Sequence, residues 1–252
     1  HLFRDFKEIL PQGVVHSPYG ATEILPVSSI VGEQALEETA ELTERGRGTC
    51  VGKPLPGVEV RIGKISDDWL GKEALEDALP PGEVGEIIVS GPSVTREYDN
   101  LPEATNRSKI RTEDCIWHRM GDLGYLDEKG RLWFCGRLAE RIQIGKKTYL
   151  TDCCEGVFNA LPDVYRSALV SLEKDGERVP CMAIQPRQGT FPKTRLERNQ
   201  FIEGLKKAAA STGMTGDIRE FVFRKTFPVD VRHNAKINRI ELARLLRRKV
   251  AD

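Results

Sequence analysis

The stretch Tyr19-Gly20-Ala21-Thr22-Glu23 places an aromatic ring, a hydroxyl and a carboxylate within five residues, around one glycine. A tight turn at a strand end would bring these side chains together, and hydroxyls and carboxylates are residue types that bind polar ligands. A polar turn after a strand explains the same residues without any ligand. The stretch alone therefore leaves both interpretations open.

Two other stretches resemble functional motifs, but neither predicts a functional site. Ile144-Gly145-Lys146-Lys147-Thr148 looks like the end of a phosphate-binding P-loop, but Glu140 stands where that motif needs its first glycine. The chain has six cysteines, none in a CxxC pair, and only Cys153 and Cys154 are adjacent. This pattern predicts reduced thiols in a cytoplasmic protein. We interpret Cys153-Cys154 as the start of a packed helix rather than as a covalent carrier.

Charge and hydropathy exclude several classes of partner. Of the 252 residues, 38 are Lys or Arg and 38 are Asp or Glu, so the net charge is zero and no nucleic-acid partner is expected. No apolar run approaches the roughly 20 residues that span a bilayer. The basic segment ELARLLRRKV is expected to dock through one face, with Leu242, Leu245 and Leu246 buried. Its arginines, Arg244, Arg247 and Arg248, are expected in solvent.

The first half of the chain is predicted to be rich in short strands. A helix is expected to end near Leu10, before Pro11 and Gly13, and a strand over residues 13–16 is expected to end at a Tyr19-Gly20 turn. A charged amphipathic stretch follows over residues 33–45. β-prone runs over residues 58–62, 86–89 and 131–135, separated by Gly and Pro, predict a small barrel or sandwich. Residues 67–81 are predicted to be a surface insertion.

The second half mixes helices and strands. A helix ending near residue 160 precedes two strands, SALVSL and CMAIQP, with a hairpin turn predicted at Asp175-Gly176. Thr194 is predicted to cap a helix that runs to Ala209. A strand over residues 221–223 and a last helix over residues 239–250 complete the chain. The fold class is therefore α+β, with a β-rich part over residues 1–136 and a small mixed domain over residues 137–252.

Four stretches together carry a family resemblance. They are YGATE, GEVGEIIVSGPSVTREYDNLPEAT, HRMGDLGYLDEKGRLWFCGR and FPVDVRHNAKINR, and VGKPLPGVEVRI fits the same pattern. In this order the stretches resemble the downstream motifs of the adenylate-forming superfamily of acyl-CoA ligases, peptide-synthetase adenylation domains and luciferases. The resemblance implies an ATP-dependent ligase in which residues 1–136 end the large AMP-binding domain. Residues 137–252 would form its lid domain.

The resemblance implies a nucleotide site. Tyr19 would stack on adenine, with Gly20 and Ala21 in the same nucleotide-binding motif. Asp122 would accept hydrogen bonds from the ribose hydroxyls. Arg137 would reach the nucleotide at the domain hinge.

The resemblance also implies three catalytic residues. Thr22 would bind phosphate oxygens, and Glu23 would hold Mg²⁺, because a carboxylate beside a triphosphate is repulsive unless a cation lies between them. Lys236 would be the catalytic lysine that stabilises charge on the phosphoryl oxygens. Read on its own, Lys236 is a solvated loop lysine.

The chain departs from the family pattern in places. His118-Arg119-Met120-Gly121-Asp122 replaces the usual Tyr-Arg-Thr-Gly-Asp, Ala139 stands at a hinge position that is often Asp or Lys, and Gln143 replaces a Lys. Ser17 stands where peptide-synthetase domains often have Asn. These departures argue against an ordinary peptide-synthetase domain.

YGATEILPVSS, RLWFCGR, TDCCE and FPVDVRHNAKI are similar to a group within this superfamily, the olefin-pathway β-lactone synthetases. Those enzymes adenylate a 2-alkyl-3-hydroxy fatty acid, whose own hydroxyl then displaces AMP. An internal nucleophile can have an effective molarity of about 10⁵ M or more, so no thiol is needed. His16 is a candidate base for this ring closure, although a histidine near a strand end can also serve packing alone.

Three alternatives stay open. The chain could belong to a long-chain acyl-CoA or acyl-AMP ligase, to a peptide-synthetase-like enzyme, or to a binding module that has lost activity. A 3-hydroxy fatty acid or another carboxylic acid is the expected substrate, and a complex with other enzymes of the pathway is a further possibility. Because the family's upstream phosphate loop is absent, the sequence predicts the C-terminal half of a longer enzyme, inactive by itself.

Overall fold

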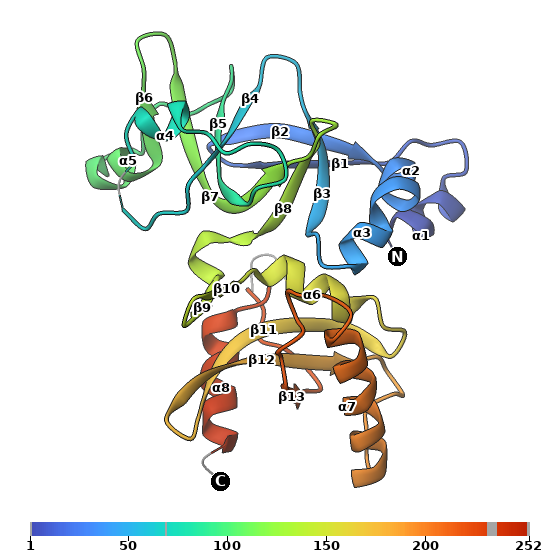
Figure 1. The fold of residues 1–252 in the computed structure, drawn as a ribbon. Coiled ribbons are helices and arrows are strands. Elements are labelled where there is room, and N and C mark those ends of the chain that lie inside the picture. Colours follow the sequence, from blue (N-terminus) through green and yellow to red (C-terminus); the bar gives the residue numbers. More distant parts are fainter. Residues whose placement is uncertain (1, 69, 231–235, 251–252) are drawn as a thin grey trace. The chain divides into compact units, whose positions relative to one another are not determined.

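The computed structural model describes residues 2–68, 70–230 and 236–250, and the chain divides into two compact units (Figure 1). The first unit comprises His1–Glu41 and Gly48–Ala139, and the second comprises Leu42–Arg47 and Glu140–Asp252. The main division between the units therefore lies after Ala139. The sequence predicts this division after residue 136.

An eight-stranded sheet forms the first unit. Its strands pair antiparallel in the order β1-β2-β3-β8-β7-β5-β4, and β6 pairs with β7 beside this path. Its members are β1 (His16–Ala21), β2 (Ile24–Val31), β3 (Thr49–Pro54), β4 (Glu59–Gly63), β5 (Gly85–Ser90), β6 (Lys109–Arg111), β7 (Ile116–Leu126) and β8 (Leu132–Arg137). No pairing between β1 and β4 is found among the described residues, so the sheet is open and the predicted barrel does not close.

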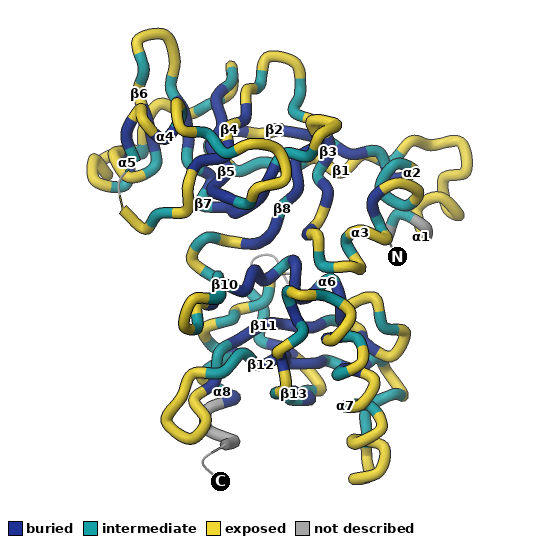
Figure 2. The backbone as a smooth tube through the Cα atoms, in the orientation of Figure 1, coloured by how far each residue is buried: buried dark blue, intermediate teal, exposed yellow. Residues whose placement is uncertain are grey.

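Apolar β-branched residues explain the centre of this sheet. Every residue of β5 is buried, including the run Ile87-Ile88-Val89, and Figure 2 shows the central strands in dark blue. Such a run fits a strand with both faces covered, since no position is left for a solvated side chain. Ile87 and Val89 pack with Ile24 and Leu132 in one core cluster.

The hairpin β1–β2 differs from the sequence prediction. The strand begins at His16, not residue 13, and continues through Tyr19 and Gly20 to Ala21, so that Thr22-Glu23 forms the turn. The predicted Tyr19-Gly20 turn is wrong because a β-bulge lies between Tyr19 and Ala21, which keeps the strand paired past the glycine. A Cβ on Gly20 would lie 2.7 Å from the Ile24 carbonyl oxygen, which explains the glycine.

Short helices precede, connect or follow these strands in the chain. They are α1 (Leu2–Ile9), α2 (Gly32–Gln34), a π-helical turn (Ala35–Thr39), α3 (Ala40–Glu44), α4 (Glu73–Glu76), α5 (Pro102–Ser108) and a 3₁₀ turn (Leu138–Glu140). The predicted surface insertion over residues 67–81 contains α4, whose Ala74 is buried. It packs in a cluster with Ile88, Ile110 and Trp117, so this segment covers the sheet rather than projecting from it.

The second unit is built on a three-stranded sheet. Antiparallel β11 (Val164–Lys174) and β12 (Glu177–Pro186) are joined by β13 (Glu220–Phe223), parallel to β12. A separate hairpin of β9 (Ile142–Ile144) and β10 (Lys147–Tyr149) precedes them. The turn of this hairpin is Gly145-Lys146, so the segment excluded as a P-loop does not open a helix.

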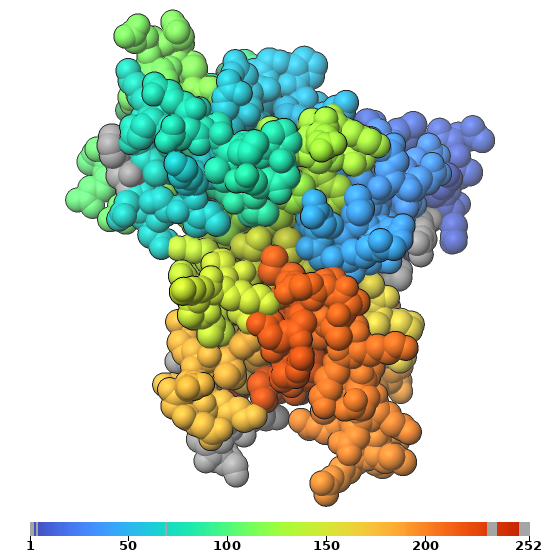
Figure 3. Space-filling view, viewed as in Figure 1, coloured from blue at the N-terminus to red at the C-terminus, as the bar shows by residue number. Residues whose placement is uncertain are grey.

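Helices cover both faces of the three-stranded sheet. Leu169, Met182 and Ile184 pack in one cluster with residues of α6 (Thr151–Asn159) and α7 (Arg195–Ala209). The alternate positions, such as Val170 and Ala183, pack against α8 (Arg239–Val250). This alternation follows from the period of two in a strand. Helix α7 is exposed along most of its length and forms an orange ridge in Figure 3.

Local signals fixed the ends of these elements as predicted. Asp175 and Gly176 both have positive φ, 53° and 80°, in the two-residue turn between β11 and β12. Such values define the primed turns that match strand twist. Thr194 accepts a hydrogen bond from the Glu197 amide, and the Glu197 carboxylate accepts one from the Thr194 amide, which forms a capping box.

Helix α8 docks through one face, as its leucine spacing predicts. Leu242 and Leu246 are fully buried, Leu245 is partly buried and Arg244 is exposed. The side chains of Arg247 and Arg248 lie outside the described residues. Within the part of the chain that the structure describes, no helix is both long and apolar enough to cross a membrane.

The first unit contains a buried ion pair. The Arg119 guanidinium lies 2.6 Å from Glu86 Oε2, and these side chains are only 8% and 1% exposed. The same guanidinium donates to the carbonyls of Ser66, Asp68 and Arg107, so it connects the loop at residues 66–68 and the end of α5 to the sheet.

We predict that Arg119→Met destabilises the first unit by about 3–5 kcal/mol, because Glu86 is left buried without its partner. The double variant Arg119→Met, Glu86→Met should recover part of this loss. Urea unfolding followed by tryptophan fluorescence measures both. Equal destabilisation by the single and double variants would contradict the role of the pair.

Candidate functional site

The site in the first unit begins where β7 and β8 pair. Asp122 on β7 lies directly opposite Arg137 on β8. Between β7 and β5 the register shifts, so that Arg119 pairs with Ile88 and Leu123 pairs with Glu86. This bulge contains Gly121, whose φ of +64° is readily adopted by glycine. The bulge redirects β7 at Asp122.

Three of the predicted site residues meet here. The Tyr19 hydroxyl donates to Asp122 Oδ2 at 2.6 Å, and Arg137 Nη1 lies 2.8 Å from Asp122 Oδ1. Tyr19 is 103 residues from Asp122 in the chain, and its ring centroid is 6.1 Å from that of Phe134. The fold therefore joins the first and third motifs through one carboxylate.

The burial of these groups differs. The Asp122 side chain is only 3% exposed, whereas that of Arg137 is 46% exposed. Burial raises the pKa of the Tyr19 hydroxyl, and the negative charge of Asp122 raises it further. Tyr19 is thus a neutral donor at physiological pH, and the Arg137 guanidinium remains accessible to a ligand.

Glu23 is held in a second cluster, at the turn of the β1–β2 hairpin. The Tyr98 hydroxyl donates to Glu23 Oε1 at 2.6 Å, and the Thr95 amide donates to the Glu23 carbonyl at 2.8 Å. The loop after β5 therefore donates hydrogen bonds to both the side chain and the backbone of Glu23.

A buried lysine supports this loop, and a buried histidine lies opposite that lysine in the sheet. Lys109 Nζ donates to Thr95 Oγ1 at 3.0 Å and lies 5.9 Å from the centroid of the Tyr98 ring. Lys109 pairs with His118 across β6 and β7, and they are 4% and 3% exposed. Burial, together with the charge of Lys109, lowers the pKa of His118 to about 4, so this imidazole is neutral at pH 7.

The electrostatics of the second cluster favour an ionised Glu23. Partial burial would raise its pKa, but the hydrogen bond from Tyr98, a backbone hydrogen bond and the charge of Lys109 outweigh that effect and lower it. Burial, together with the hydrogen bond to Glu23, raises the pKa of Tyr98 to about 12. Glu23 is therefore an anion at neutral pH.

The remaining motif residues lie on the same hairpin. Thr22 is exposed in the turn, Gly20 and Ala21 are partly buried at the end of β1, and His16 is exposed at its start. Their predicted roles toward a ligand stay predictions.

Lys236 belongs to the second unit, whereas Glu23, Asp122 and Arg137 belong to the first. It is exposed, in the segment that connects β13 to α8. Its neighbours over residues 231–235 lie outside the described residues.

The vicinal cysteines lie in α6, as predicted. Cys153 is 3% exposed and Cys154 is fully buried. Burial raises the pKa of the Cys154 thiol, which disfavours the nucleophilic thiolate.

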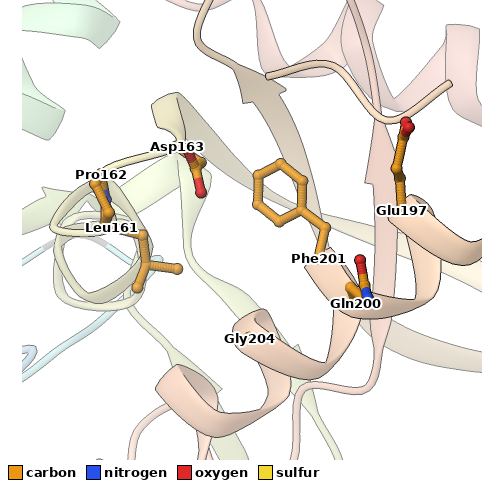
Figure 4. Close-up of a pocket in the computed structure, with 7 residues that line it drawn as sticks. All are labelled: Leu161, Pro162, Asp163, Glu197, Gln200, Phe201 and Gly204. Carbon is orange, nitrogen blue, oxygen red and sulfur yellow. The ribbon is translucent and has the colours of Figure 1, made fainter.

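A cavity of about 360 Å³ lies in the second unit, between the start of α7 and the segment after α6 (Figure 4). Phe201 projects into it opposite Leu161 and Asp163. None of its lining residues belongs to the predicted site.

The sequence prediction missed the residues that hold Glu23. Thr95 and Tyr98 lie in the second motif and Lys109 follows it, but no role was assigned to them. A tyrosine and a lysine in or near the second motif were the available signal. Which carboxylate they face depends on a contact across 75 residues.

Glu23 is a suitable partner for a magnesium ion that a nucleotide carries. Mg²⁺ usually keeps several waters and binds one or two carboxylates together with substrate phosphates. The described residues contain no group of three or more His, Cys, Asp or Glu side chains that could hold a metal by themselves. Glu23, a single ionised carboxylate at an accessible turn, fits a magnesium ion that is bound mainly by water and substrate phosphates.

Known proteins are similar to this chain in sequence. Residues 1–99 match the family model of AMP-binding enzymes. Two olefin β-lactone synthetases are similar: that of Stenotrophomonas maltophilia is 42% identical over 90% of this chain, and that of Xanthomonas campestris is 41% identical over 90%. The chain spans 41% of the length of each of these relatives.

Solved structures show the same fold at lower identity. The amide bond synthetase McbA from Marinactinospora thermotolerans superposes with a TM-score of 0.72 at 24% identity, covering 92% of this chain and 41% of that one. An O-succinylbenzoate coenzyme A synthetase from Bacillus subtilis, solved with ATP and magnesium, gives a TM-score of 0.68 at 24% identity. It covers 96% of this chain and 43% of that one.

The predicted resemblance to the adenylate-forming superfamily, and to its β-lactone synthetases, is thereby confirmed. The predicted α+β fold of that superfamily is confirmed as well.

We predict that Tyr98→Phe raises the pKa of Glu23, because the variant loses the hydrogen bond that favours the ionised form. A lowered folded-state pKa stabilises the fold above the unfolded pKa, and this contribution is lost as the pH falls through the folded value. In the variant this contribution should therefore be smaller, and its loss should be complete at a higher pH. Carboxyl titration by NMR measures the shift.

Tyr165→Phe is the matched control, since Tyr165 is 58% exposed and lies in the second unit. An unchanged Glu23 titration in Tyr98→Phe would contradict the assigned role of the hydrogen bond.

Proposed function

We propose that this chain carries part of the active site of an ATP-dependent enzyme that activates a fatty carboxylic acid as its acyl-adenylate. The cluster of Tyr19, Asp122 and Arg137 is the observation that carries the proposal. It unites two separate motifs around one buried carboxylate, beside the hairpin turn that bears Glu23.

The cluster suits the nucleoside end of ATP. Asp122 is an anionic acceptor of the kind that suits the two ribose hydroxyls. Its contacts with Tyr19 and Arg137 fix its orientation, and the exposed part of Arg137 is available to the nucleotide. Tyr19 would offer its ring to adenine while its hydroxyl stays bonded to Asp122.

The hairpin turn suits the phosphate end. Thr22 would donate to phosphate oxygens, and Glu23 would hold Mg²⁺, which supplies positive charge between carboxylate and triphosphate. Lys236 would add a second cation to the phosphoryl oxygens, where negative charge must be stabilised as the α-phosphate is attacked.

The reaction has two steps. An oxygen of the substrate carboxylate attacks the α-phosphorus of ATP. The bond between that phosphorus and the oxygen that bridges it to the β-phosphate breaks, and pyrophosphate leaves. The 3-hydroxyl oxygen of the same substrate then attacks the acyl carbonyl carbon and loses its proton. AMP leaves with the electron pair of the broken carbon–oxygen bond, and a four-membered β-lactone results.

The β-lactone product is the finer part of the proposal. It is supported by 41–42% identity to two olefin β-lactone synthetases over 90% of the chain. His16, exposed at the start of β1, is a candidate base for the hydroxyl proton. The substrate would be a 2-alkyl-3-hydroxy fatty acid, and the enzyme would act in the cytoplasm, where a complex with enzymes of the same pathway would deliver it.

A thioester-forming ligase is the second candidate. A putative acyl-CoA ligase of Bacillus subtilis is 32% identical over 72% of this chain, which favours it less strongly. In that case the acyl-adenylate would pass to a thiol acceptor.

We predict that a protein of the relatives' full length that contains this chain, here called the full-length enzyme, converts a 2-alkyl-3-hydroxy acid and ATP to a β-lactone without coenzyme A. Mass spectrometry of the products and release of AMP measure the reaction. A strict requirement for coenzyme A would instead establish the thioester-forming ligase.

We predict that Lys236→Ala and Glu23→Gln each slow adenylation in the full-length enzyme by about 10²–10³-fold, because each removes charge stabilisation from the transition state. Carboxylate-dependent exchange of labelled pyrophosphate into ATP measures adenylation alone. Lys146→Ala, at the exposed β9–β10 turn, is the control. Undiminished exchange in Lys236→Ala would exclude this role for the lysine.

A further inference from the structure

Arg239, the first residue of α8, bridges two carboxylates from different elements. Its Nε lies 2.8 Å from Glu140 Oε2, while Nη1 and Nη2 lie 2.6 and 3.0 Å from the two oxygens of Glu155. The planar guanidinium presents its donors in a rigid fork that matches a carboxylate on one side. Lysine has no equivalent geometry.

The bridge is buried and anchored to the core. The side chains of Arg239 and Glu155 are 18% and 11% exposed, and Glu155 Oε1 also accepts from the Leu169 amide of β11 at 2.7 Å. Burial raises the pKa of Glu155, and the charge of Arg239 acts against this. Arg239 is thereby fixed to α6 and to the sheet, and not only to its own helix.

Lys236 precedes Arg239 by three residues, and the backbone between them is ordered by hydrogen bonds. The Asp230 amide donates to the Lys236 carbonyl at 2.9 Å, and the Asn238 amide donates to the Pro228 carbonyl at 2.9 Å. Val229 and Ile237 form an antiparallel bridge. Hydrogen bonds therefore order the backbone between Lys236 and Arg239.

We propose that Arg239, held by Glu140 and Glu155, is a positioning residue that sets the place of Lys236 for adenylation. This inference rests on the proposed catalytic role of Lys236. Glu140 is the residue at which the main part of the second unit begins, at the end of the 3₁₀ turn that follows Arg137. The bridge thus fixes the lysine-bearing segment to the start of its unit as well as to its core.

Positioning of this kind has a measurable effect. A displacement of about 1 Å at a reacting group can cost about 10²-fold in rate. We therefore expect Arg239→Gln to lower the adenylation rate of the full-length enzyme by about 10- to 100-fold, with little change in the KM for ATP. Arg239→Lys should rescue little, because one ammonium cannot reproduce the fork.

Glu140→Gln is the variant that separates positioning from folding. The Glu140 side chain is 36% exposed, so its change leaves no buried charge without a partner, unlike a change at Glu155. We expect a smaller loss of adenylation rate and an almost unchanged melting temperature. Arg244→Gln is the control on the same helix, since Arg244 is 60% exposed and pairs with Glu241 three residues earlier.

A double-mutant cycle with Lys236→Ala decides the assignment. If Arg239 acts through Lys236, adding Arg239→Gln or Glu140→Gln to Lys236→Ala lowers pyrophosphate exchange no further. An equal additional loss in the Lys236→Ala background would overturn the proposal. Full activity of both Arg239→Gln and Glu140→Gln would overturn it as well.

These outcomes are distinct from failure of the proposed function. Undiminished exchange in Lys236→Ala itself removes the catalytic role of the lysine, and the positioning role of Arg239 falls with it. A strong effect of Lys236→Ala with none from the Arg239 and Glu140 variants removes only the positioning role. Should Arg239→Gln fail to fold, Glu140→Gln carries the test alone.

Discussion

A single buried carboxylate organises the site of the first unit. Asp122 receives the Tyr19 hydroxyl on one oxygen and the Arg137 guanidinium on the other, so three strands converge on it. A carboxylate that is almost fully buried requires such partners, because an uncompensated charge would be costly there. The sheet must therefore curve enough to bring β1 to β7, although three strands separate them in the sheet order.

The bulges in β1 and β7 make this convergence possible. One lies at Gly20 and keeps β1 paired as far as Ala21, which places the turn at Thr22-Glu23. The other lies around Gly121 and redirects β7 at Asp122. In both strands a glycine lies at the bulge, next to the functional residue. The backbone conformation at the bulge then determines where the functional side chain lies.

The two units use buried charge in a similar way. Glu23 in the first unit and Arg239 in the second are each held by side chains from other elements of their own unit. The groups that we expect to act on the nucleotide are at least partly exposed, Glu23 at its turn and Lys236 in its loop. Lys109, which supports the loop that holds Glu23, and Glu155, which holds Arg239, are buried. This division fits catalysis, in which a preorganised site needs no rearrangement during the reaction.

Local patterns in the sequence determined much of this protein. The Asp175-Gly176 turn, the Thr194 cap and the leucine face of α8 follow from interactions within a few residues, so they could be predicted without the fold. The ordered motifs likewise indicated the superfamily and named Tyr19, Asp122 and Arg137. Only the tertiary structure decided that β1 runs through Gly20, that Tyr98 and Lys109 support Glu23, and that Arg239 joins Glu140 to Glu155. Each of these depends on register or on contacts between distant segments, and the physical reason is that burial and charge pairing act between residues brought together only by the folded chain.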